Sequence, residues 1–158
     1  MKKVTSIALA LGLLVSSSVN CFAMSDTDGT AYETAVNALV EKGYISGYTD
    51  GTFRPKKTLS RAEACSIIVS FTGADADDMK AAPAAQFSDM EGYTWARPAV
   101  NYAVNNGILS GYTDGTFRPA KEVTYAELAV MVVNAMDQAD QVEGKWDTGY
   151  MTVADAQG

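Results

Sequence analysis

The sequence predicts an all-α fold built from helix–loop–helix repeats, and three observations support this prediction. The segment 43–55, GYISGYTDGTFRP, recurs as 107–119, GILSGYTDGTFRP, with two of thirteen positions changed. Apolar residues at helical spacing precede each copy. A hydroxyl residue followed three positions later by glutamate, the pattern of a helix capping box, comes after each copy. Self-similarity of this length indicates a repeat architecture.

The spacing of these features divides the chain into two repeats and the beginning of a third. The two loops lie 64 residues apart (107 minus 43), and Trp95 and Gly107 recur 51 residues later as Trp146 and Gly158. We therefore expect a fragment that stops inside its third repeat, rather than a gene that ends there. The predicted organisation is a first repeat at 24–73, a linker at 74–86, a second repeat at 87–137, a linker at 138–145 and a truncated third repeat at 146–158.

Two helices are expected in each repeat, one before the loop and one after it. The apolar positions of the first helix are Ala31, Ala35, Ala38 and Leu39 in the first repeat, and Trp95, Ala99, Tyr102 and Ala103 in the second. Gly43 and Gly107 follow them, where glycine suits a left-handed C-terminal cap. The second helices are predicted to start after Ser60 and Thr124, the hydroxyl residues of the capping boxes.

The N-terminus has the pattern of a secretory signal peptide at residues 1–23. Lys2 and Lys3 precede a short apolar run at 7–15, and a small-residue region ends at Ala23. The run is too short to cross a bilayer, so no membrane span is expected after cleavage. Acylation at Cys21 is the alternative interpretation, and Asn20 before it argues against that. Export is predicted in either case.

Composition excludes several classes of function. Removing residues 1–23 takes away two of the 12 basic residues and none of the 19 acidic ones, which leaves a net charge of −9. This balance argues against nucleic acid and anionic membranes as partners. The only remaining cysteine, Cys65, lies among apolar residues and is expected to be buried.

No catalytic or metal-binding constellation is recognisable in the sequence. The chain has no histidine, the commonest general base and metal ligand. Asp26-Thr27-Asp28-Gly29 begins like a calcium loop, but the acidic residue expected at its far end is Ala35. We therefore predict that the chain is not an enzyme and binds no metal or cofactor.

Several motifs together resemble the S-layer homology family over nearly all of the chain after residue 23. They are the GYTDGTFRP loops, Phe87-Ser88-Asp89, Trp95, and Leu59-Ser60-Arg61-Ala62-Glu63, which is similar to the family's Thr-Arg-Ala-Glu signature. The resemblance implies three motifs folded as a three-pronged unit with pseudo-threefold symmetry. It also implies grooves that bind secondary cell-wall polymer, often through a pyruvylated terminal sugar, and so tether surface proteins to Gram-positive-type walls.

The sequence departs from the family pattern at three places. Tyr125 stands where the signature has arginine, so a pyruvate site is doubtful in the second repeat. Ala31 aligns with Trp95 at the repeat offset of 64 residues, so the first repeat lacks the tryptophan. The third repeat stops early, and the chain is therefore not expected to complete the three-pronged unit alone.

Arg61 is the strongest candidate ligand residue. It falls in the first turn of a predicted helix, where backbone N–H groups and a guanidinium together suit an anion. Residues 54–61 also hold Arg54, Lys56 and Lys57 and no acid. A solvated basic face, or a pair with Glu63, is the structural alternative. The resemblance also implies that the signature arginine contacts the ligand.

The complete set of candidate ligand-binding residues comes from the loops and the signature. It consists of Arg61, Arg54, Gly47, Tyr48, Asp50, Gly51, Trp95, Gly111, Tyr112 and Asp114. Asx turns explain Asp50 and Asp114 more simply than ligand binding does. Trp95 either stacks on sugar or, more simply, anchors the apolar face of its helix.

Three functions remain open from the sequence. The first is a secreted binding module that anchors a surface protein to wall polysaccharide. The second is an assembly module of a surface layer that associates with other copies to complete its fold. The third is the N-terminal part of a longer secreted enzyme.

Overall fold

The computed structural model describes residues 24–156, and the predicted signal peptide lies outside this range. The described residues form α-helices and one 3-10 turn without a β-strand, which confirms the all-α prediction. The elements are α1 (Glu33–Glu41), α2 (Arg61–Phe71), α3 (Ala76–Ala81), α4 (Arg97–Asn105), α5 (Tyr125–Ala135), η1 (Ala139–Gln141) and α6 (Trp146–Ala156). None of these helices is long and apolar enough to cross a membrane.

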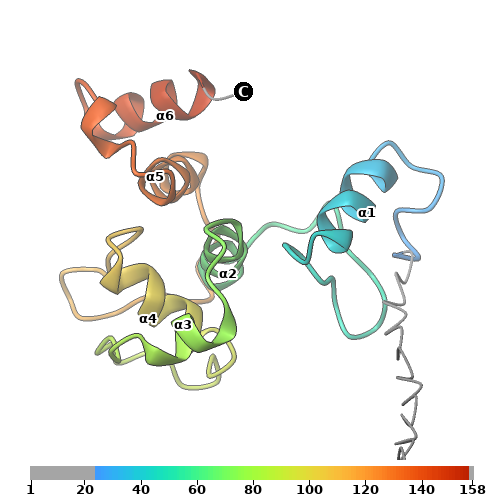
Figure 1. Cartoon of the computed structure of the whole chain (residues 1–158), viewed down its shortest axis with the longest axis horizontal. Helices are drawn as coiled ribbons and strands as arrows, with labels where there is room; N and C mark the ends of the chain where they lie inside the picture. Colours follow the sequence, from blue (N-terminus) through green and yellow to red (C-terminus); the bar gives the residue numbers. More distant parts are fainter. Residues whose placement is uncertain (1–23, 157–158) are drawn as a thin grey trace, which may run out of the picture.

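The second helix of each repeat packs against the first helix of the next repeat. The helix α2 contacts α4, and α5 contacts α6, while α2 and α5 also touch each other. Figure 1 shows the result as three arms, one with α1, one with α3 and α4, and one with α5 and α6, arranged around α2. Among the described helices none packs closely against α1. The arm with α5 and α6 therefore combines helices of two successive repeats, and α2 joins the second repeat at the centre.

The core lies where α2, α4 and the second loop meet. Val69 of α2, Val100 of α4 and Phe117 of the loop are almost completely buried. Cys65 belongs to the same cluster, as expected from the sequence, and its burial raises the pKa of the thiol to about 12. The thiol is consequently protonated at physiological pH and serves as a small packing group.

The helix boundaries follow local capping chemistry. Both capping boxes form, with Glu63 and Glu127 binding back to the backbone N–H groups of Ser60 and Thr124. The first helices begin two residues later than their apolar spacing suggests. Pro98 lies in the first turn of α4, where its missing N–H costs no helical hydrogen bond.

The segment 74–86, expected to be a linker, contains the short helix α3. Asp75 caps this helix, and α3 packs against α4. Asn105 of α4 donates to the Pro83 carbonyl at 2.8 Å, and Asn101 accepts from the Ala85 N–H at 3.0 Å. The segment is therefore held against the second repeat.

Candidate functional site

The two GYTDGTFRP loops have the same internal hydrogen bonds. Asp50 accepts from the backbone N–H and the hydroxyl of Thr52, and its other oxygen pairs with Arg54 at 2.6 Å. The second repeat repeats this arrangement at Asp114, which pairs with Arg118 at 2.9 Å. The Thr52 and Arg54 hydrogen bonds lower the pKa of Asp50 to about 2. The Asx-turn interpretation is confirmed for both aspartates.

Each loop is also held from outside by a carboxylate that the sequence analysis did not assign. Asp26 accepts from the backbone N–H groups of Phe53 and Arg54, both at 2.7 Å. Asp89 does the same in the second repeat. These bonds stabilise the left-handed backbone of Arg54, whose φ is +61°. Asp26 thus anchors a loop, and within residues 24–156 no acidic cluster is arranged to hold a metal.

Gly47 and Gly111 are needed where the loop backbone comes close to another segment. A Cβ on Gly47 would overlap the Met24 side chain, and one on Gly111 would overlap the Phe87 ring. Their presence in the repeated motif is therefore explained by packing. Gly51 has no close neighbour, and its requirement is its φ of +77°, the left-handed turn that its Asp-Gly pair predicts; Gly47 combines its close contact with a positive φ of +68°.

A tyrosine, a lysine and the capping glutamate connect each loop to the following helix. Tyr112 donates to Glu127 at 2.9 Å, and Lys121 donates to the same oxygen at 2.7 Å. Burial opposes ionisation of Glu127, but hydrogen bonds from Lys121, the Thr124 backbone and Tyr112 outweigh it and lower its pKa to about 2. The first repeat has the same arrangement at Glu63.

The basic cluster at 54–61 is largely neutralised by acids from outside that segment. Arg54 is bound to Asp50 and lies over the Tyr48 ring, with its guanidinium carbon 4.1 Å from the ring centroid. Lys57 pairs with Glu63 at 2.8 Å. Lys56 is exposed, as Arg54 and Lys57 also are, whereas Arg61 is buried in a different environment.

Arg61 is buried, with 7% of its surface exposed, and it reaches into the second repeat. Its Nη2 donates to the Ser110 carbonyl at 2.7 Å, and its Nη1 lies 3.7 Å from Glu127 Oε1. The guanidinium also lies over the rings of Tyr112 and Phe117, 5.2 and 5.1 Å from their centroids. No acceptor among the described residues binds its buried Nε. The suggested pair with Glu63 is therefore replaced by one with Glu127.

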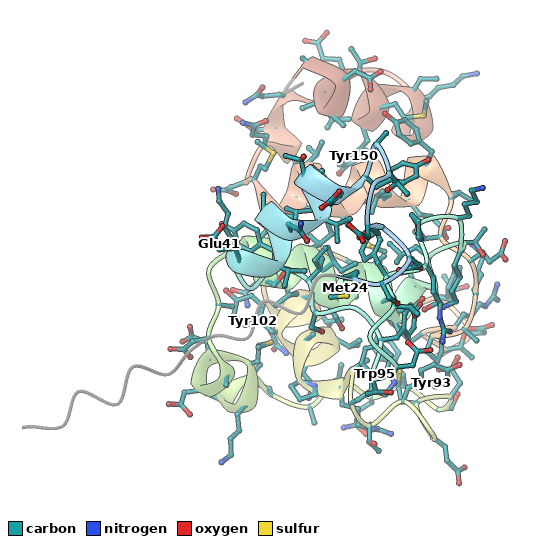
Figure 2. All side chains as sticks on the ribbon, turned by 90° about the vertical axis from the view of Figure 1, so that its right-hand side faces the viewer. Met24, Glu41, Tyr93, Trp95, Tyr102 and Tyr150 are labelled. Atoms are coloured by element: carbon teal, nitrogen blue, oxygen red, sulfur yellow. The ribbon has the colours of Figure 1, made fainter. Side chains whose placement is uncertain are left out.

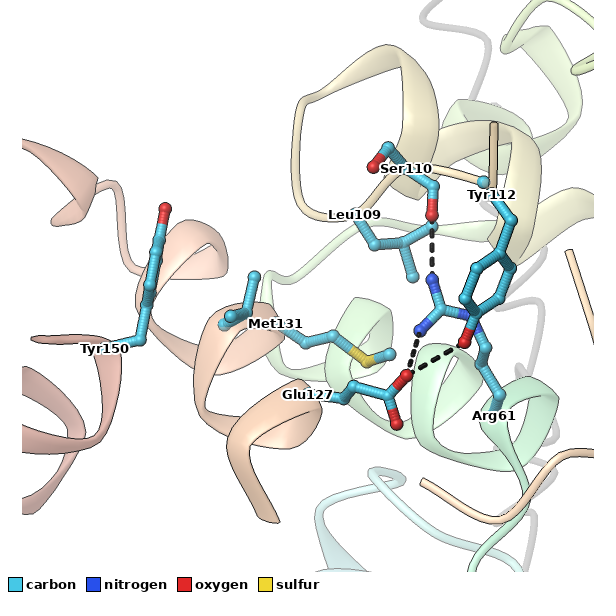
Figure 3. A pocket seen from close by; sticks show the side chains of 9 residues that line it. Arg61, Leu109, Ser110, Tyr112, Glu127, Met131 and Tyr150 are labelled. Atoms are coloured by element: carbon cyan, nitrogen blue, oxygen red, sulfur yellow. Dashed lines mark hydrogen bonds and ion pairs between the residues drawn. The ribbon is translucent and has the colours of Figure 1, made fainter. Parts of the chain in front are cut away.

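A pocket of about 340 Å³ opens beside the Arg61 guanidinium. Figure 3 shows Arg61, Ser110, Tyr112 and Glu127 grouped on one side and Tyr150 on the other. The lining residues are Arg61, Leu109, Ser110, Gly111, Tyr112, Glu127, Val130, Met131 and Tyr150. They come from α2, the second loop, α5 and α6, so three successive repeats build this one pocket. We call it the Arg61 pocket.

The structure separates the other candidates from this pocket. Gly47, Tyr48, Arg54 and Trp95 line a larger groove of about 1000 Å³, which the first repeat forms together with Trp95 of the second. Figure 2 shows Trp95 and Tyr150 apart from one another, with Tyr150 in the upper half of the view and Trp95 in the lower half. Trp95 is 56% exposed, so the expectation that it anchors its helix in the core is wrong. The reason is that α4 begins at Arg97, which leaves Trp95 outside the helix.

Three candidates, Asp50, Gly51 and Asp114, line neither cavity. At the position equivalent to Arg61, Tyr125 is 60% exposed, and its hydroxyl donates to Asp155 of α6 at 2.8 Å. This hydrogen bond raises the pKa of Tyr125. A carboxylate thus stands near the place where the preceding junction has a guanidinium.

Sequence reasoning missed Glu127 and Tyr150 as pocket residues. The sequence assigned Glu127 to helix capping alone. Its ion pair with Arg61 joins two different repeats, so it forms only when these repeats pack together. A signal for Tyr150 was present, because the offset of 51 residues aligns it with Ala99. A large aromatic residue at a small-residue position indicates a changed environment.

Comparison with known proteins identifies relatives on bacterial surfaces. The family model for the S-layer homology domain matches residues 23–65 and 86–129. A surface layer protein of Brevibacillus choshinensis is 33% identical over 157 residues, which cover 96% of this chain and 14% of that protein. Cell surface glycoprotein 1 of Acetivibrio thermocellus is 40% identical over 93 residues, 59% of this chain and 4% of that protein.

A third relative is named for an anchoring role. The cellulosome-anchoring protein of Acetivibrio thermocellus is 30% identical over 128 residues, 73% of this chain and 29% of that protein. The chain therefore spans between 4% and 29% of the length of these three relatives.

Proposed function

The chain belongs to the S-layer homology domain family, and on that premise we propose that it anchors a secreted surface protein non-covalently to the bacterial cell wall. Relatives named as a surface layer protein and a cellulosome-anchoring protein support a cell-surface location and an anchoring role. The same relatives favour binding over catalysis for this part of the chain. The partner in this proposal is the secondary polymer of a Gram-positive-type wall.

The observation that carries the proposal is the buried guanidinium of Arg61 at the edge of an open pocket. Arg61, Lys121 and Glu127 together carry one net positive charge. The Arg61–Glu127 contact, at 3.7 Å, is longer than a charge-assisted hydrogen bond. A carboxylate in the pocket would balance the charge and bind the remaining N–H groups of the guanidinium. An acidic sugar of the wall polymer is the ligand class that fits.

A pyruvate ketal on that sugar fits the surroundings of Arg61 in more detail. Such a ketal has a carboxylate and a methyl group on one carbon. Arg61 offers a partner for the carboxylate, while Leu109 and Met131 line the same pocket with apolar surface. Small-molecule sites commonly combine mainly apolar walls with a few polar groups that fix orientation. The larger groove, lined by Tyr48 and Arg54 of the first repeat and Trp95 of the second, provides a second place where the polymer would extend.

Co-sedimentation with purified walls tests the proposal. The purified chain should sediment with intact Gram-positive-type walls and remain in solution when the secondary polymer has been extracted. Arg61→Ala should lose most of this binding. Lys56→Ala removes the same charge from an exposed residue of the same segment and should bind like the wild type. Equal sedimentation with extracted and intact walls would reject the polymer as the partner.

Assembly with other copies is a second candidate function, favoured by the environment of α1. None of the described helices packs closely against it, and the adjacent groove exposes Phe71 at 46%. An apolar groove of this size suits another protein surface. Sedimentation velocity over a range of protein concentrations separates the two candidates. A monomer that binds walls supports anchoring alone, and concentration-dependent oligomers support assembly.

A further inference from the structure

We propose that Tyr150 of α6 forms an aromatic wall of the Arg61 pocket and stacks against the sugar ring of the ligand. The inference rests on the proposed function, because it concerns the same pocket and the same ligand class. It adds a specificity-determining residue that lies outside both loops and both signatures. The role assigned to it is recognition of the sugar that carries the acidic group.

The position of Tyr150 in the pocket is the first support. Tyr150 lines the pocket from α6, while Arg61 enters from α2 and Tyr112 from the second loop. Figure 3 shows Tyr150 across the pocket from Arg61 and Tyr112, with Met131 between them. A ligand whose carboxylate binds Arg61 would therefore direct its remaining bulk toward Tyr150. An aromatic face suits the apolar face of a sugar ring, and the phenolic hydroxyl suits its polar edge.

Comparison of the repeats is the second support. Offsets of 51 and 64 residues align Tyr150 with Ala99 and Ala35. Ala99 is 6% exposed and belongs to the core that α4 shares with α2. The α5–α6 pair is the equivalent junction, yet α6 carries a half-buried tyrosine at this position. Helix pairing therefore works with alanine, and the tyrosine ring supplies surface to the pocket.

The third support is that the Tyr150 hydroxyl has no hydrogen-bond partner among the described residues. The hydroxyls of three other tyrosines form hydrogen bonds within the protein. Tyr48 and Tyr112 donate to capping glutamates, and Tyr125 donates to Asp155. Within the part of the chain that the structure describes, no hydrogen bond engages the Tyr150 hydroxyl. Both its ring and its hydroxyl are thus available to a ligand.

Two probes separate the sugar from the acidic group. One is a methyl hexoside that carries a 4,6-linked pyruvate ketal. The other is 2,2-dimethoxypropanoate, which has the same carboxylate, methyl group and ketal oxygens but no sugar ring. Isothermal titration of the purified wild-type chain should detect tighter binding of the hexoside. Far-UV circular dichroism and thermal unfolding verify that each variant is folded.

Tyr150→Ala restores the residue found in the other repeats and is the main variant. It should weaken hexoside binding about tenfold and change dimethoxypropanoate binding less than about twofold, because only stacking is lost. Tyr150→Leu keeps apolar volume without an aromatic face and should behave in the same way. Tyr150→Phe keeps the ring and should retain hexoside binding within about threefold. Arg61→Ala should lose both probes.

The outcomes distinguish the two proposals. Unchanged hexoside binding in folded Tyr150→Ala overturns the role of Tyr150 and leaves the proposed function intact. An equal loss for both probes also overturns it, since Tyr150 would then only hold the pocket in shape. Binding of neither probe by the wild type rejects the acidic-sugar ligand and the Tyr150 role together.

Discussion

The two repeats carry nearly identical loops whose surroundings differ. In both, an aspartate binds a threonine and an arginine inside the loop, and a tyrosine and a lysine bind the capping glutamate. The aromatic residue that closes the loop is completely buried in the second repeat, at Phe117, and only partly buried in the first, at Phe53. Loop geometry is therefore a local property, whereas loop burial depends on the neighbouring repeat.

The neighbour that covers the second loop is the start of α2. Arg61 lies over Tyr112 and Phe117, and its backbone N–H donates to the Lys121 carbonyl at 2.8 Å. The first loop has no such helix start beside it among the described residues, and the open groove lies there instead. The Arg61 pocket thus belongs to a junction between repeats. Four predictions test this comparison, in order of decreasing effect.

The largest expected difference is between Phe117→Ala and Phe53→Ala. Phe117 has no exposed surface, so its truncation should lower the free energy of unfolding by about 3–5 kcal/mol. Phe53 is only partly buried, and its truncation should cost roughly half of that or less. Urea unfolding followed by circular dichroism measures both values. Equal losses would show that the two loops contribute equally to the core.

The second prediction concerns the asymmetry between Arg61 and Tyr125. Arg61→Ala should weaken binding of the wall polymer by about 1.5–3 kcal/mol, because a charge-assisted hydrogen bond is lost. Tyr125→Ala should leave binding nearly unchanged, since its hydroxyl is engaged by Asp155. Titration of each folded variant with solubilised polymer compares them. A larger loss in Tyr125→Ala would move the main site to the second junction.

A smaller and equal effect is expected at the helix caps. Ser60→Ala and Thr124→Ala each remove a side-chain acceptor for the N–H of the glutamate three residues later. Each substitution should lower the free energy of unfolding by about 1 kcal/mol. Ser60→Thr and Thr124→Ser keep a hydroxyl acceptor and serve as the controls. A difference between the two alanine variants well above the experimental error would contradict local capping.

The smallest effect is expected for Asp50 and Asp114, and it depends on pH. Hydrogen bonds from threonine and arginine side chains lower the pKa of both carboxyls from 3.8 to about 2. The folded pKa is depressed, so this contribution to stability is present above pH 4 and is lost as the pH falls through about 2. With Asp50→Asn or Asp114→Asn, the free energy of unfolding should fall slightly less steeply as the pH is lowered. Both are exposed, and the two variants should match if the loops are equivalent.

Much of the architecture was predictable because its signals are local. The capping boxes, the left-handed caps at Gly43 and Gly107, and the Asx turns each depend on residues within a few positions of one another. The burial of Cys65 followed from its apolar neighbours. The exposure of Trp95 was not predicted, because the apolar spacing was extended two residues beyond the real start of α4.

The sequence by itself determined the repeat pattern, the helical class and the loop geometry, and it singled out Arg61 as the candidate ligand residue. Only the tertiary structure decided where the Arg61 guanidinium lies, since Ser110 and Glu127 contact it from the second repeat and Tyr150 of α6 lines the far side of its pocket. The physical reason is the range of the interactions. Caps and turns are bonds between neighbours in the chain, while the pocket arises where helices of successive repeats pack together.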